Sequence, residues 1–236
     1  MKTDGMVQND KSWYDDTSLL HRLRKAVQNP PFGRARSRFM LRRFLRGSEQ
    51  TNAILTTFTV TIEVLRDNME VKKIYFDLDQ VLADFNRGVA ELCGLEYKEE
   101  KNLTPAADTV MWGKIREVDH FYDKLKLMQG AKKLFDAVYG KYANRCEILT
   151  GIPKPKRGIL RAGEDKINWV RRHLSEDIVV NIVFKEQKPE YCTGKDCILI
   201  DDNSKNIEAW EAMGGTGILF KSAEKTMAIL EEMGVL

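Results

Sequence analysis

The chain has 236 residues, of which 43% are hydrophobic and 31% are charged, and its mean hydropathy is −0.41. These values exclude a membrane protein, because no run approaches the roughly 18–20 apolar residues of a spanning helix. The four cysteines are too few for a disulfide scaffold, and no histidine or second cysteine pair completes a zinc site. We therefore expect a cytoplasmic protein with reduced cysteines and one or two globular domains.

The net charge of +3 is unevenly distributed along the chain. Residues 1–68 carry 12 Lys and Arg against 7 Asp and Glu, whereas residues 69–236 carry 26 against 28. Short helices are predicted over 18–27 and 34–46, and a strand over 51–65. Because the segment lacks the regular patterning of a domain, we expect residues 1–68 to be a basic, poorly ordered N-terminal extension.

Two other interpretations of this extension stay open. The stretch 21–46 holds nine basic residues and no acidic residue, as in arms that contact nucleic acid phosphates, although we favour the poorly ordered tail over nucleic acid binding. Alternatively, translation begins at Met69, four residues before the first clear strand. In each case we expect the globular domain to span residues 69–236.

Strand-like and helix-like segments alternate from residue 69 onward. Strands are predicted over 73–79, 146–150, 178–184, 197–200 and 217–220. Apolar residues at helical spacing predict helices over 131–142, 167–174, 207–213 and 222–233. This alternation predicts an α/β fold, namely a Rossmann-like parallel sheet with helices on both faces.

Polar residues follow three of the predicted strands. Asp77 and Asp79 end the first strand, Thr150 ends the second, and Asp201 and Asp202 follow the fourth. The carboxyl ends of parallel strands share one edge of the sheet, where ligands bind. Four carboxylates gathered there repel one another and require a cation, and hard oxygen ligands suit Mg²⁺. A pair of carboxylates also suits covalent phosphoryl transfer, with one as the nucleophile and the other as the acid and base.

These residues belong to four short motifs whose order resembles that of the haloacid dehalogenase-like (HAD) phosphatase superfamily. The motifs are Asp77-Leu78-Asp79-Gln80-Val81, Leu149-Thr150-Gly151, a lysine, and Ile200-Asp201-Asp202. Within the superfamily the chain is most similar to the 5′(3′)-deoxyribonucleotidase family, over DLDQVLADF (77–85), HFYDKLKLMQGA (120–131) and EDKINWV (164–170). It departs from that family at Gln80, where glycine is usual, at Met128-Gln129 in place of Leu-Pro, and in the basic loop 152–163.

The resemblance implies a magnesium-dependent phosphomonoester hydrolase that acts on (deoxy)nucleoside monophosphates through an aspartyl-phosphate. Asp77 would attack phosphorus, and Asp79 would protonate the leaving oxygen. The implied phosphate-binding residues are Thr150, Gly151 and Lys166, with Lys185 and Lys188 as alternatives for the motif lysine. The implied magnesium ligands are Asp77, the backbone carbonyl of Asp79, and one of Asp201 and Asp202.

The resemblance also implies a small helical cap inserted after the first strand, at about residues 84–130. Its aromatic residues would either bind the nucleobase or form the core of the cap itself: Phe85, Trp112, Phe121 and Tyr122. His120 and His173 are expected at the surface. Two other functions stay open at this point. One is a HAD phosphatase for another small phosphoester, and the other is a non-catalytic nucleic-acid-binding protein with a relic phosphatase fold.

Overall fold

The computed structural model describes residues 71–96 and 103–236. The predicted N-terminal extension, with its helices over 18–27 and 34–46 and its strand over 51–65, lies outside these residues. Within the described ranges, no helix has both the length and the apolar character needed to cross a membrane. All four cysteines of the chain are free thiols.

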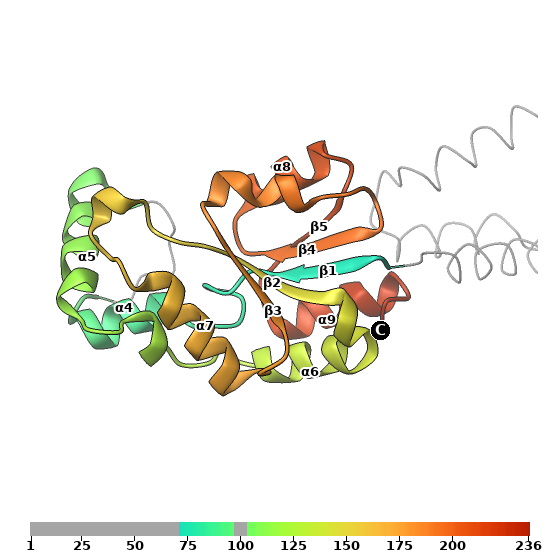
Figure 1. Ribbon diagram of the computed structural model, residues 1–236, viewed down its shortest axis with the longest axis horizontal. Coiled ribbons are helices and arrows are strands. Elements are labelled where there is room, and N and C mark those ends of the chain that lie inside the picture. Colours follow the sequence, from blue (N-terminus) through green and yellow to red (C-terminus); the bar gives the residue numbers. More distant parts are fainter. Residues whose placement is uncertain (1–70, 97–102) are drawn as a thin grey trace, which may run out of the picture. The chain divides into compact units, whose positions relative to one another are not determined.

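The described residues form a five-stranded parallel sheet, as the alternating sequence pattern predicts (Figure 1). The strand order is β3-β2-β1-β4-β5, so β1 lies at the centre. In chain order the strands are β1 (Lys73–Phe76), β2 (Cys146–Gly151), β3 (Val179–Val183), β4 (Cys197–Asp201) and β5 (Thr216–Leu219). Helices cover both faces of this sheet, which confirms the predicted fold class.

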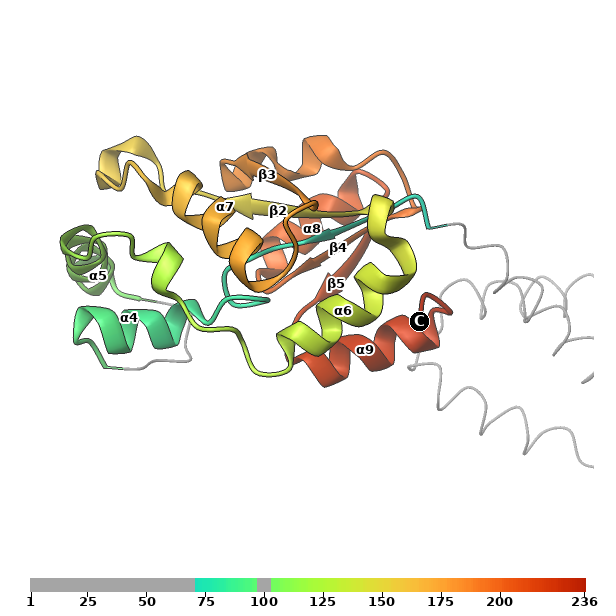
Figure 2. The ribbon, with the colours of Figure 1, turned by 60° about the horizontal axis from the view of Figure 1, so that its bottom comes forward.

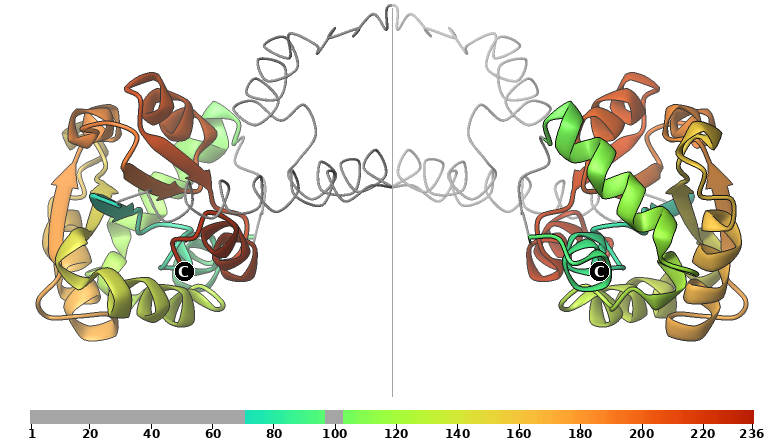
Figure 3. Two further views of the ribbon diagram at one scale, coloured as in Figure 1. Left: turned by 90° about the vertical axis from the view of Figure 1, so that its right-hand side faces the viewer. Right: turned by 90° about the vertical axis from the view of Figure 1, so that its left-hand side faces the viewer.

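The two faces of the sheet separate along β1 because successive side chains of a strand point to opposite sides. Ile74 and Phe76 belong to the larger hydrophobic cluster, whereas Tyr75 belongs to a second cluster on the opposite face. The first face is covered by α6 (Ala131–Tyr142), α7 (Ala162–His173) and α9 (Ala223–Glu232). Figures 2 and 3 show α6 and α9 side by side on this face.

A single helix, α8 (Ser204–Ala212), covers much of the opposite face in the described part of the chain. Its Trp210 is fully buried, lies 5.5 Å from the ring of Tyr75, and donates a hydrogen bond to the carbonyl of Cys197 at 3.1 Å. Gly217 of β5 lets this helix approach closely, because a Cβ there would lie 2.5 Å from Cγ2 of Ile207. The position of α8 is therefore tightly fixed against the sheet.

Between β1 and α6, the described residues 84–96 and 103–130 form a small helical subdomain, here called the cap, that lies beside the carboxyl ends of the strands (Figures 1 and 2). It contains α4 (Phe85–Cys93), α5 (Pro105–Glu117) and a short 3₁₀ helix, Tyr122–Lys124. Asp84 begins α4 by accepting a hydrogen bond from the Arg87 N–H at 3.2 Å, and Gly94 ends it with φ 63°.

The first strand is shorter than the sequence predicts. It ends at Phe76 and not at Asp79, because the chain turns directly after Asp77. The N–H groups of Leu82 and Ala83 both donate to the Leu78 carbonyl, at 2.9 and 2.8 Å. This turn places Asp79 in a loop that leads into the cap.

Candidate active site

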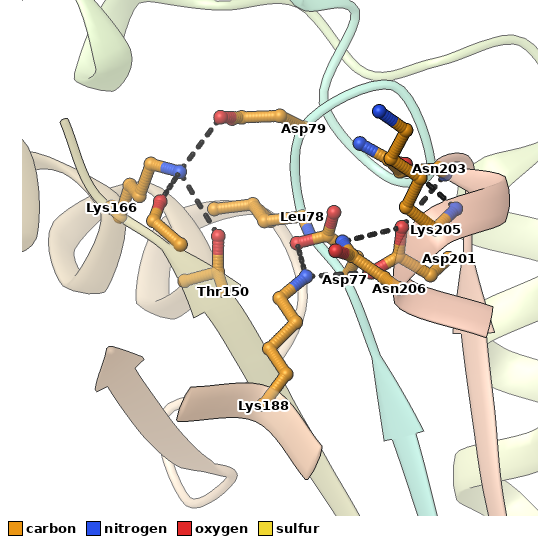
Figure 4. A network of polar contacts seen from close by, with 11 residues as sticks. Asp77, Leu78, Asp79, Thr150, Lys166, Lys188, Asp201, Asn203, Lys205 and Asn206 are labelled. Carbon is orange, nitrogen blue, oxygen red and sulfur yellow. Dashed lines mark hydrogen bonds and ion pairs between the residues drawn. The ribbon is translucent and has the colours of Figure 1, made fainter. Parts of the chain in front are cut away.

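Three neighbouring strands bring the predicted polar residues to one edge of the sheet (Figure 4). Asp77 follows β1 and donates its N–H to the Ile200 carbonyl at 2.9 Å, which holds it beside β4. Thr150 lies near the end of β2, and Asp201 is the last residue of β4. Because β1 lies between β2 and β4, Asp77 is placed between the other two side chains.

Lys188 is the residue that joins the first and fourth motifs. Its ammonium nitrogen lies 2.9 Å from Oδ1 of Asp77 and 2.7 Å from Oδ2 of Asp201, and the residue is 1% exposed. Burial lowers the pKa of Lys188, but the charges of Asp77 and Asp201 outweigh this effect and raise it above its ordinary value. Lys188 therefore stays protonated and partly neutralises both carboxylates.

Lys166, near the start of α7, occupies the other side of the site. Its ammonium nitrogen donates to Oδ2 of Asp79 at 2.8 Å, to Oγ1 of Thr150 at 2.9 Å and to the Gly151 carbonyl at 2.7 Å. It also lies 4.8 Å from the centre of the Tyr122 ring. Lys166 thus contacts the first and second motifs. Lys185, the third candidate lysine, is exposed and lies farther out along the cavity wall.

The carboxyl group of Asp79 has one oxygen on Lys166 and one without a partner. Its Oδ1 is a buried acceptor with no hydrogen-bond partner among the described residues. Burial raises the pKa of Asp79, the charge of Asp77 adds to this, and Lys166 opposes it without cancelling it. This environment favours the protonated carboxyl, which is the form that a proton donor needs.

Asp201 is held by residues that follow it in the chain. Its Oδ1 accepts from the Asn203 N–H at 2.8 Å, and Nδ2 of Asn206 donates to Oδ2 at 2.9 Å. Burial raises the pKa of Asp201 and the charge of Asp77 adds to this, while Lys188 acts in the opposite direction. Asn206 was not among the residues predicted from the sequence. The only signal for it is its place in the first turn of the helix that follows Asp201 and Asp202.

The acidic side chains have the chemistry of a magnesium site. One carboxylate oxygen from each of Asp77, Asp201 and Asp202 lies within 4.8 Å of the other two. These three carboxylates carry three formal negative charges, of which the Lys188 ammonium group, in contact with Asp77 and Asp201, offsets one. A divalent cation balances the two remaining charges, and oxygen donors are those that Mg²⁺ prefers. These residues therefore fit the magnesium ion implied by the sequence.

A cavity of about 1050 Å³ extends from these carboxylates to the cap. This volume is at the upper end of the roughly 300–1,000 Å³ of small-molecule sites. Thr150, Lys166 and Asp201 are fully buried behind the residues that form the wall. The residues that line the cavity include Asp77, Asp79, Gln80, Phe85, Asn86, Asp108, Trp112, Tyr122, Gly151, Arg157, Lys185, Lys188 and Asp202.

The four aromatic residues predicted as substrate contacts do not have equal access to this cavity. Phe85 lies at their centre: its ring is stacked on that of Tyr122 at 6.1 Å and meets that of Phe121 edge-on at 5.8 Å. Phe85, Trp112 and Tyr122 line the cavity. Phe121 is 1% exposed and is not part of the cavity wall, so the structure places it in the core of the cap.

A polar contact joins the cap to the loop after β2. The guanidinium of Arg157 donates to Oδ2 of Asp108 at 2.6 Å and lies 5.2 Å from the centre of the Trp112 ring. Trp112 in turn donates its indole N–H to Oδ1 of Asp108 at 2.8 Å. We call Asp108, Trp112 and Arg157 the clasp. The clasp connects α5 with the basic loop that the sequence analysis singled out.

A second contact joins the cap to α7 through His120. Its Nδ1 lies 2.8 Å from Oδ1 of the buried Asp165, and its Nε2 lies 3.0 Å from the Arg161 guanidinium. The hydrogen bond to Asp165 is the main cause that raises the pKa of His120, and the charge of Asp119 adds to it. The side chain is about one third exposed, so the residue predicted at the surface also ties two elements together.

A parallel sheet whose central strand is followed directly by a pair of aspartates, with a threonine motif and an acidic pair at the ends of the two neighbouring strands, defines a HAD-like phosphatase. The chain belongs to the 5′ nucleotidase, deoxy (Pyrimidine), cytosolic type C protein family, whose model matches residues 70–229. A protein of Vibrio phage KVP40 named "Putative 5′(3′)-deoxyribonucleotidase" is 30% identical over 141 residues, which are 60% of this chain and 71% of that protein. The protein is therefore a phosphatase of the nucleotidase type.

Solved structures of distant hydrolases are also similar to this chain. A HAD-superfamily hydrolase from Ehrlichia chaffeensis has 15% identity and a TM-score of 0.41, covering 70% of this chain and 98% of that one. A hydrolase from Streptococcus pneumoniae TIGR4 has 15% identity and a TM-score of 0.45, covering 69% of this chain and 99% of that one.

Proposed function

We propose that this phosphatase hydrolyses (deoxy)nucleoside monophosphates in the presence of Mg²⁺ and through an aspartyl-phosphate intermediate. The observation that carries the proposal is the division of the site between two buried lysines. Lys188 contacts the proposed nucleophile, Asp77, and Lys166 contacts the proposed acid, Asp79. The two carboxylates of one short loop are thus held in different environments, as acid and nucleophile roles require.

In the first half-reaction, a carboxylate oxygen of Asp77 attacks phosphorus and the bond from phosphorus to the leaving oxygen breaks. Oδ1 of Asp77 already accepts hydrogen bonds from the Leu78 N–H at 2.8 Å and from Lys188. We therefore assign the attack to Oδ2. Protonated Asp79 gives its proton to the leaving oxygen, so that the nucleoside departs as a neutral alcohol.

In the second half-reaction, the ionised Asp79 accepts a proton from a water molecule, which attacks phosphorus. The bond between phosphorus and Asp77 then breaks, which releases phosphate and restores both carboxyl groups. Lys166 remains beside Asp79 in both steps and stabilises its ionised form. Thr150 and the Gly151 N–H are proposed to hold phosphate oxygens at the end of β2.

A Mg²⁺ ion held at this site would supply positive charge where negative charge develops on the transferred phosphoryl group. Asp77, Asp201 and Asp202 are proposed to hold it, together with the Asp79 carbonyl. Asn203 and Asn206 orient Asp201 toward this position through their hydrogen bonds. We also propose that the enzyme acts in the cytoplasm.

The aromatic wall of the cavity supports a nucleotide as the substrate. Phe85 and Trp112 are partly exposed and line the cavity, and every nucleobase has a face that can stack on such rings. Both residues line the same cavity as Asp77, so a phosphate at the carboxylates and a base at the cap occupy one continuous space. Family membership supports the same substrate class.

The test is a panel of phosphomonoesters given to the purified full-length protein, with Mg²⁺ and with EDTA. The panel contains deoxyribonucleoside and ribonucleoside 5′- and 3′-monophosphates, sugar phosphates and p-nitrophenyl phosphate. We expect magnesium-dependent phosphate release with the highest kcat/KM on the nucleotides, and Asp77→Asn should lower turnover by orders of magnitude because it removes the attacking charge. A higher kcat/KM on sugar phosphates would contradict the substrate proposal, and near-normal turnover of Asp77→Asn would contradict the covalent mechanism.

A further inference from the structure

Gln80 has a backbone conformation that its residue type rarely adopts. Of the described residues other than glycine, Gln80 and His120 have positive φ angles, 60° and 51°. The left-handed region is unfavourable for residues with a Cβ atom, and glycine occupies it without this cost. This explains why glycine is usual directly after the second aspartate of the motif. A glutamine at this position therefore needs an interaction that compensates for the unfavourable conformation.

The side chain of Gln80 accepts a hydrogen bond at the N-terminus of α4, the first helix of the cap subdomain. Its Oε1 accepts a hydrogen bond from the N–H of Asn86, the second residue of α4, at 2.9 Å. The first N–H groups of a helix have no acceptor within the helix, and Asp84 satisfies a different one, that of Arg87. Gln80 therefore supplies, from six residues upstream of Asn86, a helix-capping hydrogen bond that a glycine could not provide.

This hydrogen bond connects the catalytic loop with the cap. Gln80 directly follows Asp79, and its own N–H donates to the Ala83 carbonyl at 2.7 Å, which closes the loop on itself. Asn86 and its neighbour Phe85 begin α4, and both line the cavity together with Gln80. The bond thus fixes the first turn of α4 relative to the carboxyl group of Asp79.

We propose that Gln80 is a positioning residue, whose side chain holds the first turn of α4 in a fixed position relative to Asp79. This role explains why the unfavourable backbone conformation of Gln80 is retained. The inference rests on the proposed role of Asp79 as the proton donor. Without the bond, α4 and the loop shift independently, and Asp79 no longer meets the leaving oxygen of a substrate held by the cap. Misplacement of a catalytic group on this scale costs roughly tenfold to a hundredfold in rate.

Two variants separate this role from a structural one. Gln80→Gly removes the hydrogen bond and relieves the backbone, so we expect kcat on a deoxynucleotide to fall at least tenfold while Tm stays equal to that of the wild type or rises. Gln80→Met keeps a side chain of similar length without the acceptor, so we expect the same loss of kcat together with a lower Tm. Amide hydrogen exchange at Asn86 should accelerate in both variants.

Gln80→Glu is the rescue variant, because its carboxylate can accept from the same N–H. We expect it to restore slow exchange at Asn86 and to recover kcat at least threefold over Gln80→Met. A Gln80→Gly enzyme with kcat within twofold of the wild type would overturn the inference. The proposed function would not be affected by that result, because the wild type would still hydrolyse the nucleotide. A wild type that hydrolyses no phosphomonoester would overturn the proposed function and the inference with it.

Discussion

Replacing Lys188 by methionine tests how strongly the stability of the fold depends on the ion pairs of Lys188 with Asp77 and Asp201. The variant keeps the length of the side chain but leaves Oδ1 of Asp77 and Oδ2 of Asp201 without the ammonium group that lies 2.9 and 2.7 Å away. Both aspartates are less than a tenth exposed, so water can replace the lost contacts only in part. Removing one partner of a buried ion pair costs about 3–5 kcal/mol. We expect Lys188→Met to lower the free energy of unfolding by that amount in EDTA at pH 7.

The assay is urea denaturation of the wild type and the variant, with Lys185→Met as the matched control. Lys185 lies three residues earlier in the same 3₁₀ helix (Lys185–Tyr191) but is exposed, so its replacement should change the free energy of unfolding by less than about 0.5 kcal/mol. Asp77→Asn in the Lys188→Met background should recover part of the loss, because it removes one of the two uncompensated charges. Turnover of Lys188→Met should fall by orders of magnitude.

The reasoning would be refuted by a Lys188→Met protein whose free energy of unfolding in EDTA lies within about 1 kcal/mol of the wild-type value. That result would mean that the two carboxylates do not depend on Lys188 for their compensation. An equal loss in Lys185→Met would instead mean that the 3₁₀ helix tolerates no substitution, whatever the charge.

Three further predictions concern the cap, its connection to α7, and the N-terminal segment. Phe85→Ala should raise KM for a nucleotide about fivefold to a hundredfold, since base stacking contributes roughly 1–3 kcal/mol, while KM for p-nitrophenyl phosphate changes little; equal losses on both substrates would assign Phe85 to the cap core. The raised pKa of His120 means that its contact with Asp165 stabilises the fold fully below the ordinary pKa of 6.5 and loses this effect as the pH rises through the folded-state value. The free energy of unfolding, measured by urea denaturation, should therefore fall more between pH 6 and pH 8 for the wild type than for His120→Gln. An equal fall in both proteins would contradict this. Deletion of residues 1–68 should leave kcat on p-nitrophenyl phosphate within about twofold, because every proposed catalytic residue follows Met69; an unfolded or inactive truncation would show that the segment stabilises the domain.

The fold and the main carboxylates could be predicted because they depend on patterns within single segments. Apolar strands that end in Asp77, Thr150 and Asp201 predict a shared sheet edge through the geometry of parallel strands alone, and the structure has these residues on β1, β2 and β4 or directly after them. No knowledge of loop conformation is needed for that step.

The lysines could not be assigned in the same way. Lys166 and Lys188 both approach the carboxylates, but Lys188 does so from a 3₁₀ helix that contains Pro189 and has no hydrophobic periodicity. Its direction depends on how that helix packs against α8 and β2, which spacing along the chain does not reveal. Phe85 directly follows the DLDQVLAD stretch (77–84) and is therefore the best candidate in sequence, but Phe121 could not be assigned to the substrate or to the cap core until packing showed it buried away from the cavity.

The left-handed conformation of Gln80 could not be predicted from the sequence either. The residue type argues against a positive φ, and the compensating hydrogen bond to Asn86 exists only once α4 is formed and placed. A departure from a familiar motif therefore indicated an unusual position without indicating how the chain accommodates it.

The close approach of α8 to the sheet makes the geometry of the proposed metal site depend on residues that lie outside it. The N-terminal turn of α8 carries Asn206, which orients Asp201, while the body of the same helix rests on Gly217 through Ile207. Any side chain at position 217 would push the helix outward, and Asn206 would move with it. The positions at which substitutions impair catalysis therefore extend across the sheet to its edge strand, and a survey confined to the cavity wall would overlook them.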